Sequence, residues 1–265
     1  MSRWTPAPRT LVGMVHLGAL PGTPRNEATV ATIVETAVRE AAMLVDAGFD
    51  AILVENMHDL PYLRRTVGSE IVAAMTIATG AIADAVGAVP VGVQVLAGAN
   101  REALSIAHAA GARFIRAEGF AYAAVADEGL LDEADAGPLL RHRRNIGADA
   151  VSIWSDVQKK HSAHVLTGDL TLADLIAGHE FMGADAAIVT GNHTGQAVSV
   201  HDLAVARQAG SIPIVVGSGA SPESLPELLE HATAVIVGSA LKKDGFWANP
   251  VDPDRAAAFV AARGR

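Results

Sequence analysis

The 265-residue sequence predicts an α/β protein, a (β/α)8 TIM barrel formed by a single domain over residues 1–265. Short apolar runs rich in β-branched residues alternate with amphipathic stretches rich in Ala, Leu and Glu along the whole chain. The apolar runs lack polar alternation, which is typical of parallel strands buried on both faces. No low-complexity linker divides the chain. Together, these patterns favour one barrel of eight βα units.

The eight strands follow from the apolar runs in chain order. We expect them at residues 11–17, 51–55, 90–96, 114–118, 150–154, 186–190, 212–217 and 234–238. An open doubly wound sheet is the alternative arrangement. It rarely has eight strands, and no G-x-G-x-x-G motif follows the first run. The sequence therefore favours the closed barrel.

The intervening helices carry recognisable start and stop signals. Helices over 28–47 and 101–110 are each followed by a glycine suited to a left-handed C-terminal position, Gly48 and Gly111. Serine or aspartate at the other end predicts N-caps. These are Ser199 before a helix at 203–209, Ser221 followed by Pro222, and Asp252 followed by Pro253 before a helix at 255–262.

Composition excludes several function classes. The net charge of −9 argues against a nucleic-acid partner, and the absence of cysteine excludes disulfides, thiol nucleophiles and Cys-ligated metals. The apolar runs are strand-length, well below the roughly 20 residues of a bilayer-spanning helix. The N-terminus has no apolar segment of the secretory type. We expect a cytoplasmic protein without a membrane span, and a homo-oligomer from base rates.

The active site of such barrels lies at the C-terminal ends of the strands, and this rule selects the candidate residues. The candidate catalytic residues are Glu55, Asp156, His16 and Glu118. The candidate substrate-binding residues are Asn56, Gln94, Arg116, Lys159, His161 and Asn192. Carboxyl groups at these positions suit acid–base chemistry, because desolvation raises a carboxyl pKa toward neutrality. The alternative interpretation is structural: the acids form ion pairs, or cap the loop that follows, at the barrel mouth.

Glycine-serine turns after the last two strands predict a phosphate site. Gly217, Ser218 and Gly219 follow the seventh strand, and Gly238 and Ser239 follow the eighth. Glycine lets the backbone approach an anion, backbone N–H groups and hydroxyls can bind it, and Lys242 could add charge. The alternative is that these turns only connect strands to helices. Their occurrence in both of the last two units favours phosphate binding.

The sequence favours metal, imine and flavin chemistry less than acid–base chemistry on a phosphorylated ligand. Histidines lie near the expected mouth, but neither an H-x-H strand nor an H-E-x-x-H helix is present, so we predict no metal. No expected strand interior contains the lysine that imine chemistry needs. A flavin-dependent barrel is weaker still because only 4% of the residues are aromatic. We predict no cofactor.

Several segments resemble the BtpA/SgcQ family. They are GMVHLGALPGTP, AILVENMHD, IWSDVQKKHS, AAIVTGNHTG, VVGSGAS and IVGSALK, and the resemblance covers about residues 11–245. The family is similar to ribulose-phosphate-binding barrels, which implies a TIM barrel with a phosphate site. In cyanobacteria its name is attached to photosystem I biogenesis, while other bacterial members appear beside sugar-utilisation functions. The resemblance supplies no established reaction, but Glu55, Asn56, Asp156, Lys159, His161 and both turns lie in its motifs.

Two functions follow from these observations. The first is an enzyme acting on a phosphorylated sugar or a phosphoribosyl or nucleoside-type small molecule, as an isomerase, lyase or glycosyl-bond hydrolase. The second, implied by the resemblance, is a non-catalytic assembly or stability factor for a membrane complex. Acids, amides and a phosphate cradle at one barrel mouth favour the enzyme, since an assembly factor has no need of them.

Overall fold

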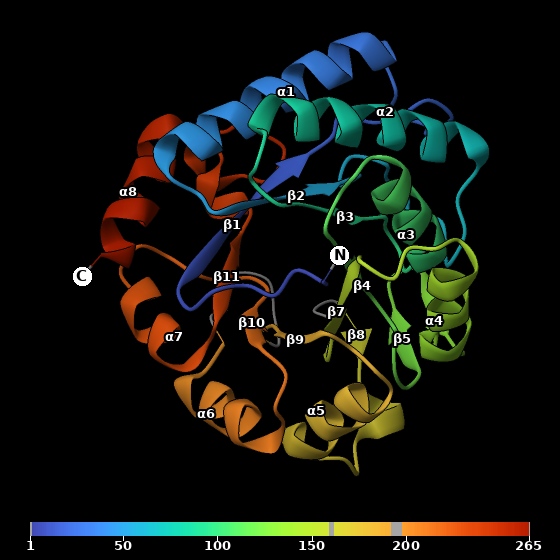
Figure 1. Cartoon of the computed structure of the whole chain (residues 1–265), viewed down its shortest axis with the longest axis vertical. Helices are drawn as coiled ribbons and strands as arrows, with labels where there is room; N and C mark the ends of the chain where they lie inside the picture. Colours follow the sequence, from blue (N-terminus) through green and yellow to red (C-terminus); the bar gives the residue numbers. More distant parts are fainter. Residues whose placement is uncertain (1, 159–161, 192–197, 265) are drawn as a thin grey trace.

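The computed structural model describes residues 2–158, 162–191 and 198–264, and it confirms the predicted barrel (Figure 1). The barrel strands pair in parallel in the closed order β1-β11-β10-β9-β7-β4-β3-β2. They are β1 (Thr10–His16), β2 (Ala51–Glu55), β3 (Val91–Gln94), β4 (Phe114–Ala117), β7 (Ser152–Asp156), β9 (Ala186–Val189), β10 (Ile214–Val216) and β11 (Ala234–Val237). Every barrel strand pairs on both sides, so the sheet has no open edge.

An outer ring of helices covers this barrel (Figure 1). The helices are α1 (Val30–Ala47), α2 (Ser69–Val86), α3 (Asn100–Ala109), α4 (Ala136–Asn145), α5 (Leu172–Phe181), α6 (Val200–Ala209), α7 (Leu225–His231) and α8 (Pro253–Arg263). Within the described residues, three short 3₁₀ turns lie in the loops that follow strands: η1 (Val165–Thr167), η2 (Ser239–Leu241) and η3 (Lys243–Gly245). Each barrel strand is thus followed by its own helix, as βα repetition requires.

Most of the predicted helix signals are confirmed. Gly48 ends α1 in the left-handed region, and its N–H bonds to the carbonyls of Leu44 and Val45. Ser199 caps α6 by accepting a hydrogen bond from the N–H of Asp202, and Asp252 caps α8. The start predicted at Ser221 and Pro222 is three residues too early. Residues 222–224 form turns, and α7 begins at Leu225.

The fifth barrel strand lies two residues later than predicted. The apolar run at 150–154 indicated its position, but β7 is Ser152–Asp156. The carboxylate of Asp185 accepts the N–H of Ile153, which pins the beginning of this strand to the adjacent β9 segment. As a result, Asp156 is the last residue of the strand rather than part of the loop, and its side chain is fixed by the sheet.

One expectation about apolar segments is wrong. We expected strand-length apolar runs only, but α2 is 18 residues long with a mean hydropathy of 1.4, enough by length and composition to cross a membrane. In the fold, α2 is one of the helices around the barrel (Figure 1) and buries Ile71, Met75, Ala78 and Ile82. Only 33% of this stretch is buried, and a helix that packs one face against a barrel can pass the same test of length and composition as a membrane span.

A second sheet lies beside the barrel, and the sequence patterns did not predict it. The hairpin of β5 (Ala124–Ala126) and β6 (Gly129–Leu131) follows β4, and β8 (Ser162–Ala163) follows β7. The three strands pair in the antiparallel order β6-β5-β8. The sheet therefore ties together the loops after two neighbouring barrel strands, on the side of the barrel where we expected the site.

Aromatic stacking fills the interior of the barrel. The ring centroids of Phe114 and Trp154 lie 4.2 Å apart, and Trp4 from the N-terminal segment stacks on Trp154 at 5.3 Å. Gly92 on β3 makes room for this stack, because a Cβ there would lie 2.3 Å from the ring of Phe114. The interior is therefore a packed core below the mouth, as in other small barrels.

Candidate active site

The predicted mouth residues share the inner face of the barrel. Side chains alternate between faces along a strand, so a residue two positions after an interior residue also faces inward. Met14, Leu53, Phe114 and Trp154 belong to the interior cluster. The residues two positions later are His16, Glu55, Arg116 and Asp156. Pairing places His16 opposite Glu55, and Glu55 opposite Gln94. The structure therefore brings these side chains into one layer at the C-terminal ends of the strands.

Arg116 and Asp156 form a buried ion pair across neighbouring strands. Arg116 Nε donates to Asp156 Oδ2 at 2.9 Å and Nη2 donates to Oδ1 at 2.8 Å, in a bidentate geometry. The two side chains are 8% and 1% exposed. Burial by itself lowers the pKa of Arg116, but the adjacent Asp156 carboxylate outweighs it and the net pKa is raised. Arg116 therefore stays charged, and the pair supplies a fixed guanidinium in the mouth.

His16 and Glu55 form a second pair, on β1 and β2. His16 Nε2 lies 3.6 Å from Glu55 Oε2, and both side chains are buried. His16 Nδ1 lies 3.1 Å from the carbonyl oxygen of Trp247. A carbonyl only accepts, so this contact is a hydrogen bond when Nδ1 carries the proton. Nε2 then faces the carboxyl group of Glu55. At 3.6 Å the two atoms form an ion pair when His16 is protonated, not a direct hydrogen bond. Both groups are of the types that acid–base chemistry uses.

Glu118 is positioned by hydrogen bonds from Gln94 to its side chain and between Asn100 and its backbone. Gln94 Nε2 donates to Glu118 Oε1 at 3.3 Å. The buried side chain of Asn100, at the start of α3, accepts from the N–H of Glu118 and donates to its carbonyl at 3.1 and 2.8 Å. Among the described residues, no donor meets the buried Gln94 Oε1. The Gln94 side chain therefore has its amide donor engaged by Glu118 and its buried acceptor unpartnered within the described part of the chain.

Asn56 is engaged in holding loops together. Its Nδ2 donates to Asp59 at 2.9 Å, and its Oδ1 accepts from the N–H of Leu96 at 2.8 Å. Asp59 also accepts from the N–H of Leu20 at 2.8 Å. This buried network joins the loops that follow β1, β2 and β3. A substrate-binding role for Asn56 stays a prediction, while its positioning of the mouth loops is visible.

The two glycine-serine turns lie at the ends of β10 and β11. A Cβ at Gly217 would lie 2.6 Å from both Ile188 and Thr190, so this position needs glycine to fit against β9. Gly219 has a φ of +80°, which also favours glycine. Among the described residues, no acceptor meets the backbone N–H of Gly219 or Ser239. These amides remain available to an anion, and phosphate binding there stays a prediction.

Lys242 is turned away from the predicted phosphate site. Its Nζ donates to Glu40 Oε2 at 2.7 Å, and Glu40 Oε1 accepts the N–H of Val251. Lys242 is 1% exposed, so its charge is compensated inside the protein rather than offered to a ligand. This ion pair fastens the segment after β11 to α1. The expectation that Lys242 adds charge to the turns is therefore wrong.

The structure adds residues that sequence reasoning missed and leaves others untested. Burial raises the pKa of Tyr62, and the negative charges of Glu55, Glu128 and Glu118 raise it further. Its hydroxyl donates to the carbonyl of Met57 at 2.8 Å, in the loop after β2. A tyrosine in a long loop has no sequence signal that ties it to a strand end. The predictions for Lys159, His161 and Asn192 lie outside the described residues.

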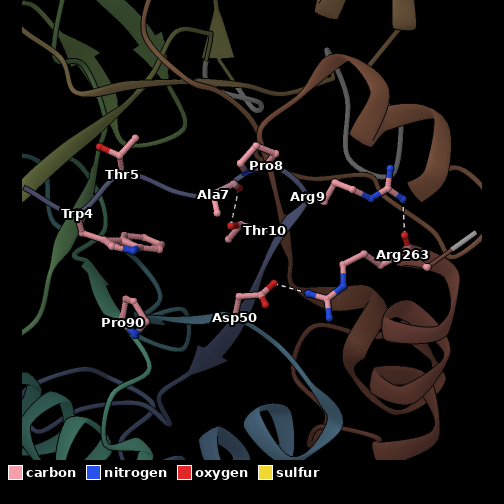
Figure 2. Close-up of a pocket in the computed structure, with 10 residues that line it drawn as sticks. Trp4, Thr5, Ala7, Pro8, Arg9, Thr10, Asp50, Pro90 and Arg263 are labelled. Atoms are coloured by element: carbon pink, nitrogen blue, oxygen red, sulfur yellow. Dashed lines mark hydrogen bonds and ion pairs between the residues drawn. The ribbon is translucent and has the colours of Figure 1, made fainter.

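A hollow also opens at the opposite end of the barrel. Its volume is about 520 Å³, and its lining includes Trp4, Arg9, Asp50, Pro90 and Arg263 (Figure 2). Arg263 pairs with Asp50 along its wall. Chemistry in these barrels belongs to the C-terminal face, so we assign the site to the acid-lined mouth rather than to this hollow. In the described part of the chain, no three metal-ligating side chains gather at either end.

A closed barrel of eight parallel strands with this layer of acids at its C-terminal face defines the chain as a TIM-barrel protein with an acid-lined mouth. Residues 7–265 match the model of the BtpA family. The chain belongs to that family, which confirms the resemblance seen in the sequence.

Two relatives agree with this family assignment, and a solved structure shares the fold. An uncharacterized mitochondrial protein of Caenorhabditis elegans is 40% identical over 252 residues, which are 94% of this chain and 90% of the relative. The photosystem I biogenesis protein BtpA of Synechocystis sp. is 37% identical over 255 residues, covering 95% of this chain and 87% of that protein. The solved thiamine phosphate pyrophosphorylase of Pyrococcus furiosus shares the fold with a TM-score of 0.57 and 14% identity, over 96% of this chain and 95% of that one.

Proposed function

We propose that this protein is an enzyme acting by acid–base chemistry on a phosphorylated sugar or a phosphoribosyl or nucleoside-type small molecule. The observation that carries the proposal is the inner layer itself. It collects the His16–Glu55 pair, Glu118 and the Arg116–Asp156 pair beside two turns with available amides. The name of the structural neighbour from Pyrococcus furiosus, a thiamine phosphate enzyme, is in keeping with a phosphorylated ligand.

In the proposed mechanism, the glycine-serine turns bind the phosphate and the acid–base residues transfer protons. The turns at Gly217–Gly219 and Gly238–Ser239 bind the phosphate and so fix the substrate over the barrel, which lowers the barrier by orientation. Glu55 exchanges a proton with the reacting carbon or its oxygen, and His16 supplies or receives that proton. Arg116 stabilises negative charge that develops on the substrate. Proton abstraction in an isomerase or lyase, and protonation of a leaving group in a hydrolase, both use these roles.

Thermal unfolding with candidate ligands tests the phosphate site. A sugar phosphate at about 100 times its Kd should stabilise the protein by roughly 2.7 kcal/mol, a rise of several degrees in Tm. Gly219→Asp should abolish this shift by placing a negative charge in the turn. Gly111→Asp is the matched control, since Gly111 also has a positive φ, lies at the opposite end of the barrel and has open space around it. If no phosphorylated compound raises Tm, the proposal is wrong.

Turnover of the ligand found in this way tests the acid–base role. Glu55→Gln keeps the shape of the side chain and removes its proton exchange, so kcat should fall by about 10²- to 10⁴-fold with little change in Tm. Glu35→Gln on the exposed face of α1 should leave kcat unchanged. Equal activity of Glu55→Gln and the unaltered protein would refute the assignment.

A second candidate function is assembly of a membrane complex. The Synechocystis relative is named for photosystem I biogenesis, and the second sheet with η1 exposes apolar side chains, among them Val165, Leu166 and Leu130. Complementation of a cyanobacterial strain lacking that relative separates the two functions. If the Glu55→Gln chain restores photosystem I as well as the unaltered chain does, the assembly role is favoured over the enzyme.

Cellular setting and assembly state complete the proposal. The net charge of −9 favours small-molecule rather than nucleic-acid partners, and we propose a cytoplasmic homo-oligomer. Light scattering of the purified protein measures the oligomeric state. A monomer at micromolar concentration would contradict that part of the proposal.

A further inference from the structure

Three rings gather at the rim of the mouth beside the His16–Glu55 pair. Trp247 and Phe246 follow η3 in the loop between β11 and α8, and His58 lies in the loop after β2. The ring centroids of His58 and Trp247 are 5.0 Å apart, and those of Phe246 and Trp247 are 5.7 Å apart. The tryptophan therefore joins two loops from different barrel strands into one aromatic surface, which we call the ring platform (His58, Phe246 and Trp247).

The ring platform is tied directly to the proposed chemistry. The carbonyl of Trp247 contacts His16 Nδ1 at 3.1 Å, so the platform and the acid–base pair share a contact. The same segment begins at the Gly238–Ser239 turn and is fastened by the buried Lys242–Glu40 ion pair. The proposed phosphate turn and the ring platform are thus two ends of one anchored loop.

The composition of the ring platform suits a planar aromatic ligand. Phe246 is 52% exposed, whereas Phe49, Phe114, Phe120 and Phe259 are buried. The chain has three tryptophans, and two of them, Trp4 and Trp154, stack inside the barrel while Trp247 lies at the rim. Burial and the nearby Lys242 lower the pKa of His58 despite Glu40, so its ring is neutral near pH 7. Neutral and apolar rings bind bases by stacking rather than by charge.

We propose that the ring platform of His58, Phe246 and Trp247 binds the planar aromatic group of the substrate, whose phosphate lies on the glycine-serine turns. This inference rests on the proposed function and narrows it to one substrate class. That class is the nucleoside 5′-phosphates and other phosphoribosyl compounds that carry an aromatic base. Simple sugar phosphates would fill the phosphate turns and leave the rings uncovered.

Calorimetric titration of the unaltered protein tests this choice of class. The probes are the four common ribonucleoside 5′-monophosphates, ribose 5-phosphate and inorganic phosphate. We expect at least one nucleotide to bind about tenfold tighter than ribose 5-phosphate, because stacking of one base on aromatic side chains has an effect of that order. Binding of that nucleotide should also quench tryptophan fluorescence, and Trp247→Leu should remove the quenching.

Two exposed phenylalanines provide a matched pair of variants. Phe246→Ala should weaken nucleotide binding about tenfold and leave the Kd of ribose 5-phosphate unchanged. Phe181→Ala removes a phenylalanine that is 88% exposed at the end of α5, and it should change neither Kd. Because both side chains are exposed, both variants should keep the fold, and circular dichroism checks this.

The outcomes separate this inference from the proposed function. If ribose 5-phosphate binds as tightly as every nucleotide, the ring platform is not a base site, and the phosphate site still stands. The same conclusion follows if Phe246→Ala weakens ribose 5-phosphate and nucleotides equally. If none of the phosphorylated probes binds, the proposed function fails and this inference fails with it.

Discussion

Replacing Asp156 by alanine should destabilise the protein strongly, because the change leaves Arg116 as a buried charge without its bidentate partner. The two hydrogen bonds of this pair are 2.9 and 2.8 Å long, and the Asp156 side chain is 1% exposed. Removing one member of such a buried pair costs about 3–5 kcal/mol. The charges of Glu55 and Glu118 also favour the Arg116 cation, so we expect the lower end, about 3 kcal/mol. In a chain of this length the Tm should fall by roughly 6–12 °C.

A double variant distinguishes two causes of the lost stability: the unpaired charge of Arg116 and the packing lost with the Asp156 side chain. Arg116→Met with Asp156→Leu removes both charges and keeps apolar volume, and such replacements are often neutral or stabilising. Urea unfolding followed by circular dichroism gives the free energy of unfolding of the single and double variants. A loss of less than about 1 kcal/mol in Asp156→Ala would show that Arg116 does not depend on this partner. A double variant as unstable as the single one would show that the unpaired charge is not the cause.

Two further predictions concern the layers on either side of the barrel strands. Burial lowers the pKa of His179 to about 4 from 6.5, so protonation of this ring opposes folding. Its neutral form contributes fully to the free energy of unfolding above pH 6.5, and this contribution is lost as the pH falls toward 4. Between pH 7 and 5 the free energy of unfolding should fall by about 2 kcal/mol, and a His179→Gln variant that lacks this slope would support the assignment. Gly92→Ala should cost roughly 1–3 kcal/mol, because its Cβ would lie 2.3 Å from the Phe114 ring. Gly80→Ala, with open space on α2, should be neutral or slightly stabilising, and equal losses in urea unfolding would contradict the steric argument.

The inner layer of the mouth could largely be predicted from the sequence. The location of active sites at the C-terminal ends of barrel strands was sufficient to select His16, Glu55, Gln94 and Asp156. In the structure all four lie on the inner face. The residue types at these positions also marked them as candidates, since carboxyl and imidazole groups are costly to bury without a partner or a role.

The second sheet was not predictable from local patterns. Its strands are two or three residues long, and they show neither an apolar run nor a clear alternation. β5 pairs with β8, which follows more than 30 residues later in the chain, beyond α4 and β7. Short-range sequence rules do not detect such a pairing, because its stability comes from contacts between distant segments.

By itself, the sequence determined the βα repetition, the closed barrel and the identity of the polar residues at its mouth, because period, turn residues and caps are local properties of the chain. How those residues pair depends on the folded arrangement of distant segments. In the fold, Asp156 forms an ion pair with Arg116 and Lys242 forms one with Glu40. The backbone carbonyl of Trp247 contacts the His16 ring. Such pairings depend on the relative positions of strands and loops far apart in the sequence. A buried charge takes whichever partner the packed fold brings within reach.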